Sequence, residues 1–437
     1  MNAEALRAVA DARALRGAVE ARLPLAESLF DEIRNASAAE AGVTRPAWSA
    51  EDQFASDRLA DTAGALGLEA AYDHAGNLYC TLPGRDRDAP AVLTGSHTDS
   101  VPTGGHYDGL AGAVAGLVAL AAFRDLGWQP GRDVTAVATR AEESVWFGIP
   151  FIGARLALGS LSYDHLDSLR RSDTGRSLAE HMAALGLDAD ALRRVAAPRL
   201  SPANACAFLE LHIEQGPVLV AEDVQVAVPT VIRGNVRWPG ATCHGRYDHS
   251  GATPRDHRQD TVLAAAELVQ GLEAFWIARE QGGEPDTVFT VGKLFTDGAH
   301  HAMTKVPGRC YFTLNFGGTS QAFLDACRAE VETRAAEIAA RRRVTFDLGE
   351  CVGAPPAPLD EPLRAVLEDS AAALEIPTRR FATVGHDAAV FQRAGIPAAM
   401  VLVRNAHGSH NPEEAMALDD FGAGCAVLAA AIARLAA

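Results

Sequence analysis

The feature that most constrains this chain is a set of short, almost continuous apolar runs that alternate with long helical patterns. The runs cover residues 91–96, 133–139, 207–213 and 398–404, and residues 110–127 repeat alanine, leucine and glycine with helical spacing. Residues 1–75 also show apolar positions three and four apart, as helices do. Strands that are apolar on both faces belong to parallel sheets with helices on both sides. The sequence therefore predicts an α/β protein built on a largely parallel sheet, with helices on both faces.

The stretch 229–350 has a different texture. Its strand-like runs alternate more and surround two helical patterns, residues 261–280 and 322–342, as in a small α+β unit. We interpret it as an inserted domain, so that residues 1–228 and 351–437 form the other domain. A length of 437 residues is about three times that of a typical single domain and agrees with this division.

Composition excludes several classes of protein. The net charge of −17, from 56 acidic and 39 basic side chains, argues against non-specific binding to nucleic acid or anionic membranes. The seven cysteines are scattered, odd in number and never in a C-x-x-C pair, which favours a reducing cytoplasm. The N-terminus lacks the apolar core of a signal peptide, and we identify no transmembrane span. We therefore expect a cytoplasmic protein.

Side chains that can bind metals follow each of the four apolar runs. They are His97 with Asp99 and Asp108, then Glu142 and Glu143, then His212, and lastly His407 and His410. In open α/β sheets the functional crevice lies beyond the carboxyl ends of the strands, so parallel strands would bring these side chains to one edge. A lone histidine or a lone pair of glutamates is more often an ordinary polar residue. The convergence of all of them indicates a metal site.

The types of side chain also suit a hydrolytic site. Three imidazoles and two carboxylates fit zinc, or manganese, cobalt or nickel. A bridging carboxylate can hold two metals about 3.5–4 Å apart, an arrangement that supports attack by hydroxide. Neighbouring side chains at a strand end point in different directions, so Glu142 and Glu143 could supply one ligand and one general base.

Several longer stretches resemble the N-carbamoyl-L-amino-acid hydrolase and allantoate amidohydrolase group. These stretches are HTDSVPTGGHYDG (97–109), AEESVWFGIPFIGA (141–154), LELHIEQGPVL (209–219), HSGATPRDHRQD (249–260), GHDAAVF (385–391) and GSHNPEE (408–414). Members of this group are dinuclear-metal amidohydrolases related to the co-catalytic zinc aminopeptidases and carboxypeptidases. The resemblance covers nearly all of residues 29–433.

The resemblance implies a role for each site residue. His97 and His212 would bind one metal ion, Glu143 and His410 the other, and Asp108 would bridge the two. Glu142 would be the general base, and Asp99 would orient the imidazole of His97. His249 would stabilise the oxyanion across a dimer interface, Gln215 would touch the substrate, and His386 would support the site without binding metal. The inserted domain would serve as lid and as the contact of a homodimer.

Two positions depart from the group. Carbamoylases usually carry an asparagine and an arginine that bind the α-carboxylate of the substrate, where this chain has Thr304 and Gly317. A glycine cannot replace a bidentate arginine–carboxylate contact. Either another arginine reaches the pocket or the substrate lacks an α-carboxylate in the usual place, and we favour the second explanation. The candidate arginines are Arg233, Arg237, Arg255, Arg309 and Arg404.

Trp146 and Phe147 are a smaller departure, since smaller or charged residues usually follow the glutamate pair. They would either narrow the pocket as an aromatic wall or pack in the core beside the site.

The leading hypothesis is a dinuclear-metal amidohydrolase that cleaves a non-peptide linear amide or ureide C–N bond. Its alternatives with the same centre are an aminopeptidase-like acyl-amide hydrolase and a hydrolytic deaminase. The non-enzymatic alternative is a binding protein that has lost catalysis. A decayed site should lack a ligand or the base, and this chain retains all of them, which disfavours that alternative.

Overall fold

The chain divides into two compact units in the computed structural model, which describes residues 11–195, 197–284 and 286–437. The first unit is Met1–Thr230 with Leu359–Ala437, and the second is Val231–Pro358. The second unit therefore begins close to the predicted start at residue 229 but ends later than the predicted end at residue 350. The reason is that β15 (Val352–Ala354) pairs with β8 (Gly234–His244) of the same unit. The helical pattern expected over residues 1–10 lies outside the described residues.

The first unit is built on an eight-stranded sheet in the order β1-β2-β4-β3-β5-β19-β6-β17. Its strands are β1 (Glu69–Tyr72), β2 (Leu78–Leu82), β3 (Ala91–His97), β4 (Val134–Thr139), β5 (Ala205–Ile213), β6 (Val226–Ala227), β17 (Thr378–Arg379) and β19 (Ala398–Val403). The four apolar runs of the sequence form the central strands β4, β3, β5 and β19, which are parallel to one another. The predicted largely parallel sheet is thus confirmed, and the antiparallel strands β1 and β2 at its edge are an addition. β1 also corrects the expectation of helix throughout residues 1–75.

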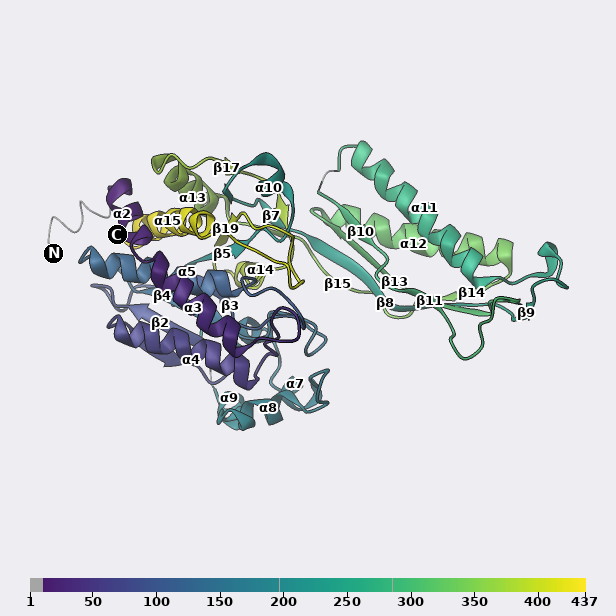
Figure 1. The fold of residues 1–437 in the computed structure, drawn as a ribbon, viewed down its shortest axis with the longest axis horizontal. Coiled ribbons are helices and arrows are strands. Elements are labelled where there is room, and N and C mark those ends of the chain that lie inside the picture. Colours follow the sequence, from purple (N-terminus) through teal and green to yellow (C-terminus); the bar gives the residue numbers. More distant parts are fainter. Residues whose placement is uncertain (1–10, 196, 285) are drawn as a thin grey trace. The chain divides into compact units, whose positions relative to one another are not determined.

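Helices cover both faces of this sheet (Figure 1). They are α2 (Ala12–Glu20), α3 (Leu23–Ala36), α4 (Ala50–Ala65), α5 (Leu110–Asp125), α6 (Ile152–Ala157), α7 (His165–Ser168), α8 (Leu178–Ala184), α9 (Ala189–Arg193), α10 (Val218–Glu222), α13 (Glu361–Ala373), α14 (Ala388–Arg393) and α15 (Leu418–Leu435). Side chains alternate along β5: Leu209 and Leu211 pack into the large core with α5 and α15, whereas Phe208 stacks on Phe391 of α14. Both faces of the central strands are therefore buried, which explains their continuous apolar sequence.

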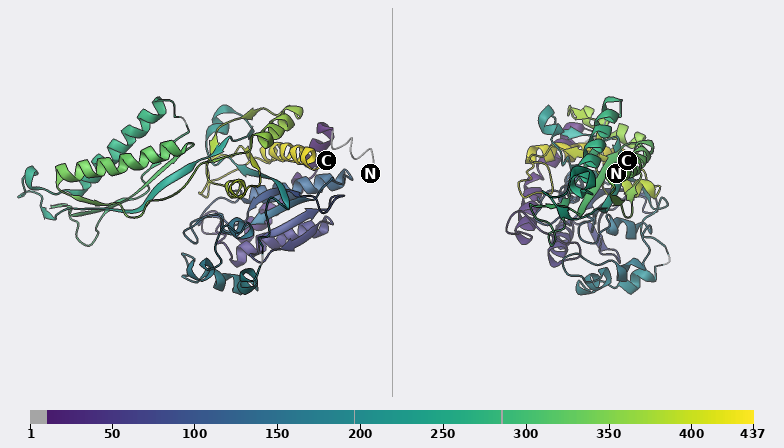
Figure 2. Two further views of the ribbon diagram at one scale, coloured as in Figure 1. Left: turned by 180° about the vertical axis from the view of Figure 1, so that it is seen from behind. Right: turned by 90° about the vertical axis from the view of Figure 1, so that its right-hand side faces the viewer.

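The second unit is an antiparallel sheet with two long helices, α11 (Thr261–Gln281) and α12 (Gln321–Arg342), along one face (Figure 2). The sheet has the order β10-β13-β8-β14, with β11 on β13 and β15 on β8. The remaining elements of this unit are β7 (Val231–Ile232), β9 (Asp248–His249), the 3₁₀ helix η1 (Arg255–His257), β10 (Val288–Thr290), β11 (Leu294–Thr296), β12 (Lys305–Val306), β13 (Arg309–Gly318), β14 (Thr345–Asp347) and β16 (Ala357–Pro358). Alternate residues of β13, such as Phe312 and Leu314, point into the core under the helices. The expected small α+β domain is confirmed.

Helix α11 is the one described helix whose length and apolar composition would suffice to cross a membrane. One face of it packs in the core of the second unit through Leu268 and Leu272. In its first third, Glu267 forms ion pairs with Arg341 and Arg342 of α12. An ionised pair of this kind is expensive inside a bilayer, so these contacts fit a helix at the surface of a folded unit.

Candidate metal centre

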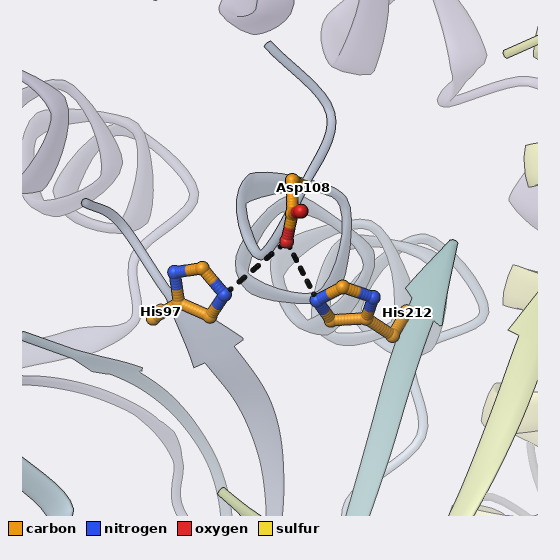
Figure 3. A group of neighbouring side chains, drawn as sticks. All are labelled: His97, Asp108 and His212. Atoms are coloured by element: carbon orange, nitrogen blue, oxygen red, sulfur yellow. Dashed lines mark ion pairs between the residues drawn. The ribbon is translucent and has the colours of Figure 1, made fainter. Parts of the chain in front are cut away.

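One group of metal-binding side chains gathers at the carboxyl ends of β3 and β5. His97 ends β3, His212 lies near the end of β5, and Asp108 comes from the loop before α5; all three are buried. Oδ1 of Asp108 lies 3.1 Å from Nε2 of His212 and 3.5 Å from Nε2 of His97. Figure 3 shows both imidazoles turned towards this one carboxylate. Strands far apart in sequence thus deliver three potential ligands to one point.

A second group uses the other oxygen of the same carboxylate. Oδ2 of Asp108 lies 3.3 Å from Nε2 of His410, which in turn lies 3.2 Å from Oε1 of Glu143. Glu143 follows β4, and His410 belongs to the loop after β19. Within each group the potential ligand atoms lie within 4.8 Å of one another. Two clusters that share Asp108 suggest a dinuclear metal site. His407, the other histidine of the loop, belongs to neither cluster among the described residues.

The hydrogen bonds of the imidazoles direct lone pairs at the shared carboxylate. Nδ1 of His97 lies 3.0 Å from the Asp99 carbonyl oxygen, and Nδ1 of His212 lies 3.0 Å from that of Ile213. A carbonyl accepts only, so each Nδ1 carries the proton and each Nε2 presents a lone pair. Oδ1 of Asp108 is buried and accepts no hydrogen bond from the described residues. The backbone amide of Gly109 donates to Nε2 of His212 at 3.1 Å, and the described residues provide no donor to Nε2 of His97 or to Oδ1 of Asp108. A set of acceptor atoms that converges with so few donors fits a cation.

The pKa shifts of the cluster residues also fit a site for a cation. Burial raises the pKa of Asp108, but His212, His410 and His97 outweigh it and hold that pKa well below its usual range. Asp108 and Glu143 raise the pKa of His410 to about 11. The carboxylates of the site therefore stabilise positive charge placed next to them.

The carboxylate of Asp99 lies beside His97, as expected, and it also holds a neighbouring segment. This carboxylate accepts hydrogen bonds from the backbone amides of Glu142, at 3.1 Å, and Glu143, at 3.3 Å. Nδ1 of His97 is nearer to the backbone carbonyl of Asp99, at 3.0 Å, than to its carboxylate, at 3.5 Å. The side chain of Asp99 thus mainly holds the segment that carries the two glutamates.

Glu142 stands beside the clusters with its carboxylate unengaged. Among the described residues, this carboxylate has no hydrogen bond or ion pair. Burial and the neighbouring charge of Glu143 raise the pKa of Glu142 well above its ordinary value. A carboxyl group with a raised pKa holds a proton more readily than an ordinary carboxylate does, which suits a general acid–base.

The backbone near the clusters adopts an uncommon conformation. Ala141, Gln215, His407 and His410 all have positive φ angles, between 51° and 67°. Positive φ is unfavourable for residues other than glycine and tends to persist where the surrounding structure enforces it, often at functional sites. At Ala141 and His410 it sets the direction of Glu142 and of a cluster imidazole.

Gln215 lies at the shared carboxylate. Its Nε2 atom donates to Oδ2 of Asp108 at 2.7 Å, while its own Oε1 atom is buried without a hydrogen bond from the described residues. Its backbone amide donates to Asn405 at 2.9 Å. Gln215 is thus next to the clusters, with a free acceptor for a further group.

His249 belongs to the second unit and to neither cluster among the described residues. It lies in β9, where Nδ1 accepts hydrogen bonds from the amides of Gly251 and Ala252, each at 3.1 Å. These amides place the proton of a neutral imidazole on Nε2, which is exposed to donate. The ring therefore has the tautomer that hydrogen bonding to an oxyanion requires.

His386 is buried behind the first cluster. Its ring centre lies 4.3 Å from that of His212, and its Nε2 atom lies 3.1 Å from Oγ1 of Thr383. It is not among the atoms of either cluster. This position fits a supporting residue.

The aromatic pair after the glutamates packs in the core. Trp146 and Phe147 are both buried, Nε1 of Trp146 donates to the carbonyl of Ser100 at 2.8 Å, and Phe147 meets Trp48 edge to face. Of the two expected roles, core packing beside the site therefore describes these residues, and an aromatic wall of the pocket does not.

The structure also explains the glycine at position 317. A Cβ atom there would lie 2.7 Å from Cγ2 of Val288 on the neighbouring strand β10, so the place of a side chain is already filled. Of the candidate arginines, Arg233, Arg255 and Arg404 pair with carboxylates, and Arg309 contacts the hydroxyl of Tyr311. Arg237 contacts the amide oxygen of Asn315 and has no carboxylate partner among the described residues. Arg237 is thus the candidate whose charge is least engaged.

Two residues that hold the site together were not predicted. Glu414 and Ser409 both lie in the GSHNPEE stretch, and both contact the segment of Asp108. Their position in the stretch around His410 indicated that they lie near the site. The sequence does not show that their side chains contact the segment of Asp108.

This arrangement defines the class of protein: a hydrolase-type α/β domain with paired metal clusters, joined to a small α+β domain. Residues 93–434 match the Peptidase family M20/M25/M40, to which the chain therefore belongs. Similar proteins include an N-carbamoyl-L-amino-acid amidohydrolase of Paenarthrobacter aurescens, 33% identical over 92% of this chain and 96% of the relative. An allantoate amidohydrolase of Escherichia coli is 31% identical over 90% and 93%.

Solved structures agree with this membership. An amidase of the hydantoinase/carbamoylase family from Burkholderia multivorans superposes with a TM-score of 0.85 at 28% identity, over 95% of this chain and 97% of that chain. The resemblance seen in the sequence is therefore confirmed: the chain falls in the hydantoinase/carbamoylase group of amidases. The relatives named here are amidohydrolases, which act on C–N bonds other than peptide bonds.

Proposed function

We propose that this protein is a dinuclear-metal amidohydrolase that cleaves a linear amide or ureide C–N bond in a substrate unlike a simple N-carbamoyl amino acid. The observation that carries the proposal is the division of Asp108 between the two clusters, with the unengaged carboxylate of Glu142 beside them. A site with these parts has its general base and its cation ligands in one place.

Two zinc ions are the cofactors we propose, because imidazole and carboxylate ligands suit zinc; manganese, cobalt and nickel fit the same donors. His97, His212 and Oδ1 of Asp108 would hold one ion, and Oδ2 of Asp108, Glu143 and His410 the other. When bound, the ions supply Lewis acidity towards the carbonyl and lower the pKa of water.

The residues of the chain carry the proton transfers. Glu142 would accept the proton of the attacking water as the new C–O bond forms, and then deliver it to the leaving nitrogen as the C–N bond breaks. Asp99 keeps Glu142 in position through its amide. Nε2–H of His249 would donate to the oxyanion, and Oε1 of Gln215 would accept from a donor group of the substrate.

The substrate proposal is supported by the filled position beside Gly317. An arginine at position 317 would collide with the side chain of Val288. With glycine at this position, the chain lacks the arginine that usually contacts the α-carboxylate of the substrate. A relative from Arabidopsis thaliana, 28% identical over 94% of this chain, is a ureidoglycolate hydrolase, so ureides are among the substrates to compare.

A substrate screen tests this function. Metal-reconstituted enzyme would be offered ureides, N-carbamoyl-L-amino acids, acyl amides, dipeptides and aryl amines, with kcat/KM as the measurement. We expect the highest kcat/KM with a linear ureide or amide. High kcat/KM with N-carbamoyl-L-amino acids would contradict the substrate proposal, and preference for dipeptides or amines would favour the aminopeptidase-like or deaminase alternative.

We further propose a homodimer formed through the second unit. Strand β10 lies at the end of the sheet order, and α11 exposes apolar side chains, with Leu263 51% and Ile277 43% exposed. An unpaired strand edge beside an exposed apolar helix face is a common setting for association.

A cytoplasmic location is also a proposal. All seven cysteines are free thiols, as expected in a reducing compartment. Fractionation of cells that express the tagged protein would test it.

A further inference from the structure

A buried carboxylate outside both clusters connects the loop of Asp108 with the loop of His410. Glu414 is 5% exposed and is not a member of either cluster. Its Oε1 atom accepts hydrogen bonds from the backbone amides of Tyr107, at 2.9 Å, and Asp108, at 3.2 Å. One side chain therefore fixes the backbone that presents the shared carboxylate.

The other oxygen of Glu414 faces the loop of His410. Oε2 accepts from the hydroxyl of Ser409 at 2.6 Å, and the same hydroxyl lies 2.5 Å from Oδ2 of Asp108. A hydroxyl has one hydrogen, so it can donate to only one of these carboxylates at a time. Ser409 is thus shared between Glu414 and the Asp108 oxygen of the second cluster.

The surrounding backbone is shaped to admit this carboxylate. A Cβ atom at Gly105 would lie 2.1 Å from Cδ of Glu414. Only a glycine at this position leaves room for the side chain of Glu414. Residues Ala406 and Ala415 close the His410 loop with two backbone hydrogen bonds, of 2.7 and 3.1 Å, directly beside Glu414. Glu414 therefore sits at the rigid base of the loop and reaches across to the segment before α5.

A similar pair of carboxylate–amide hydrogen bonds holds the segment of Glu142 and Glu143. The carboxylate of Asp99 accepts from the consecutive amides of Glu142 and Glu143. Two of the ligand-bearing segments are thus each held by a buried carboxylate that accepts from two successive backbone N–H groups. The difference is that Glu414 also contacts a second ligand loop.

We propose that Glu414 is a positioning residue that holds Asp108 between the two clusters and, through Ser409, makes a cation in one cluster favour a cation in the other. The inference rests on the dinuclear centre of the proposed function. Outer partners of metal ligands typically change metal affinity or activity by about 10–100-fold.

Titration of the metal-free protein with Co²⁺ tests the proposal, with binding followed by visible absorbance and calorimetry. We expect the wild-type protein to bind two Co²⁺ ions per chain with positive cooperativity. In Glu414→Ala, the weaker of the two binding steps should lose about tenfold or more in affinity and the cooperativity should disappear. Glu414→Gln should keep most of the affinity, because an amide oxygen still accepts both N–H groups. Its NH2 group cannot accept from the hydroxyl of Ser409, so the cooperativity should disappear in this variant as well.

The neighbouring Glu413 provides a matched control, since its side chain is exposed and it lies next to Glu414 in the same loop. Glu413→Gln should leave both binding steps unchanged. If Glu414→Ala does not fold, Ser409→Ala keeps the bonds of Glu414 to both amides and removes only the hydroxyl that connects Oε2 of Glu414 with Oδ2 of Asp108. That variant should still lose cooperativity.

The outcomes separate this inference from the proposed function. Two bound Co²⁺ ions with unchanged affinity and cooperativity in Glu414→Ala or Ser409→Ala would overturn the positioning role alone. A Glu414→Gln variant as weak as Glu414→Ala would overturn the hydrogen-bond account. A wild-type protein that binds no second ion would count against the dinuclear centre itself.

Discussion

Oδ1 of Asp108 lies 3.1 Å from Nε2 of His212, and this contact joins the loop before α5 to the end of strand β5. The other oxygen of the same carboxylate, Oδ2, lies beside Nε2 of His410. One aspartate therefore belongs to both clusters and fixes the position of one cluster relative to the other.

Replacement of Glu142 should separate catalysis from metal binding. Glu142→Gln keeps the size of the side chain but cannot accept a proton, so we expect kcat to fall about 10²–10⁴-fold while both metal ions are retained. Glu143→Gln should instead lower the metal content, because Glu143 contacts His410 in the second cluster. Metal analysis and steady-state kinetics on both variants would check this. Retained turnover in Glu142→Gln would show that another group is the base.

Gly109 should tolerate no side chain. Its φ is +67°, and a Cβ atom would lie 2.3–2.4 Å from ring atoms of His97. We expect Gly109→Ala to displace that imidazole and to lower metal affinity and activity together. Gly127→Ala is the matched control, because Gly127 also has a positive φ, of +63°, but has no atom within 4 Å of the added Cβ. It should lose about 1–2 kcal/mol of unfolding free energy. Equal metal affinity in the two variants would contradict this prediction.

His181 should contribute to acid sensitivity away from the metal centre. Burial first, and then Arg171 and Arg176, lower the pKa of His181 from 6.5 to about 4. Between these two pH values the unfolded chain binds a proton that the folded chain does not, so the unfolding free energy falls as the pH is lowered from about 6.5 to about 4.

His181→Gln can keep the hydrogen bond to Thr174 and removes this titration. Urea unfolding at a series of pH values should therefore show a shallower decline in the variant. The metal clusters titrate equally in both proteins, so the difference between the two curves isolates His181. Parallel curves would refute the assignment.

An arginine at position 317 should not be accepted without a second change. Gly317→Arg meets Val288, and overpacking of this kind costs about 1–3 kcal/mol, so we expect a lower Tm. Gly317→Arg combined with Val288→Ala should recover much of that Tm. A gain of kcat/KM with N-carbamoyl-L-amino acids in the double variant would show that this position controls the substrate. An unchanged Tm in the single variant would contradict the predicted overpacking and would show that β10 can move to accommodate the arginine.

The exposed face of α11 should control association. Leu263→Glu with Ile277→Glu places charges on that face, and we expect the variant to be monomeric by light scattering after gel filtration. Val220→Glu is the control, since Val220 is 48% exposed on α10 of the first unit and should leave the oligomeric state unchanged. A double variant with the mass of the wild type would exclude this face as the contact.

Much of the fold could be predicted because the central strands are local, almost uninterrupted apolar runs. The ligands could be predicted for a related reason: parallel neighbours bring their carboxyl ends to one edge, so His97, Glu143, His212 and His410 had to approach one another. The strands at the sheet edge, β1 and β2, were missed because short, partly exposed strands lack a distinctive pattern.

The sequence by itself determined the sheet, the inserted domain and the kinds of side chain at the strand ends, because these depend on burial patterns and on order along the chain. Only the tertiary structure decided which oxygen of Asp108 serves which cluster, that Asp99 holds the amides of the glutamates, and that Trp146 turns into the core. It also showed that Glu414 reaches back to the Asp108 loop and that Val288 fills the place of an arginine at 317. These are contacts between residues remote in sequence, and their geometry follows from packing, which no local pattern records.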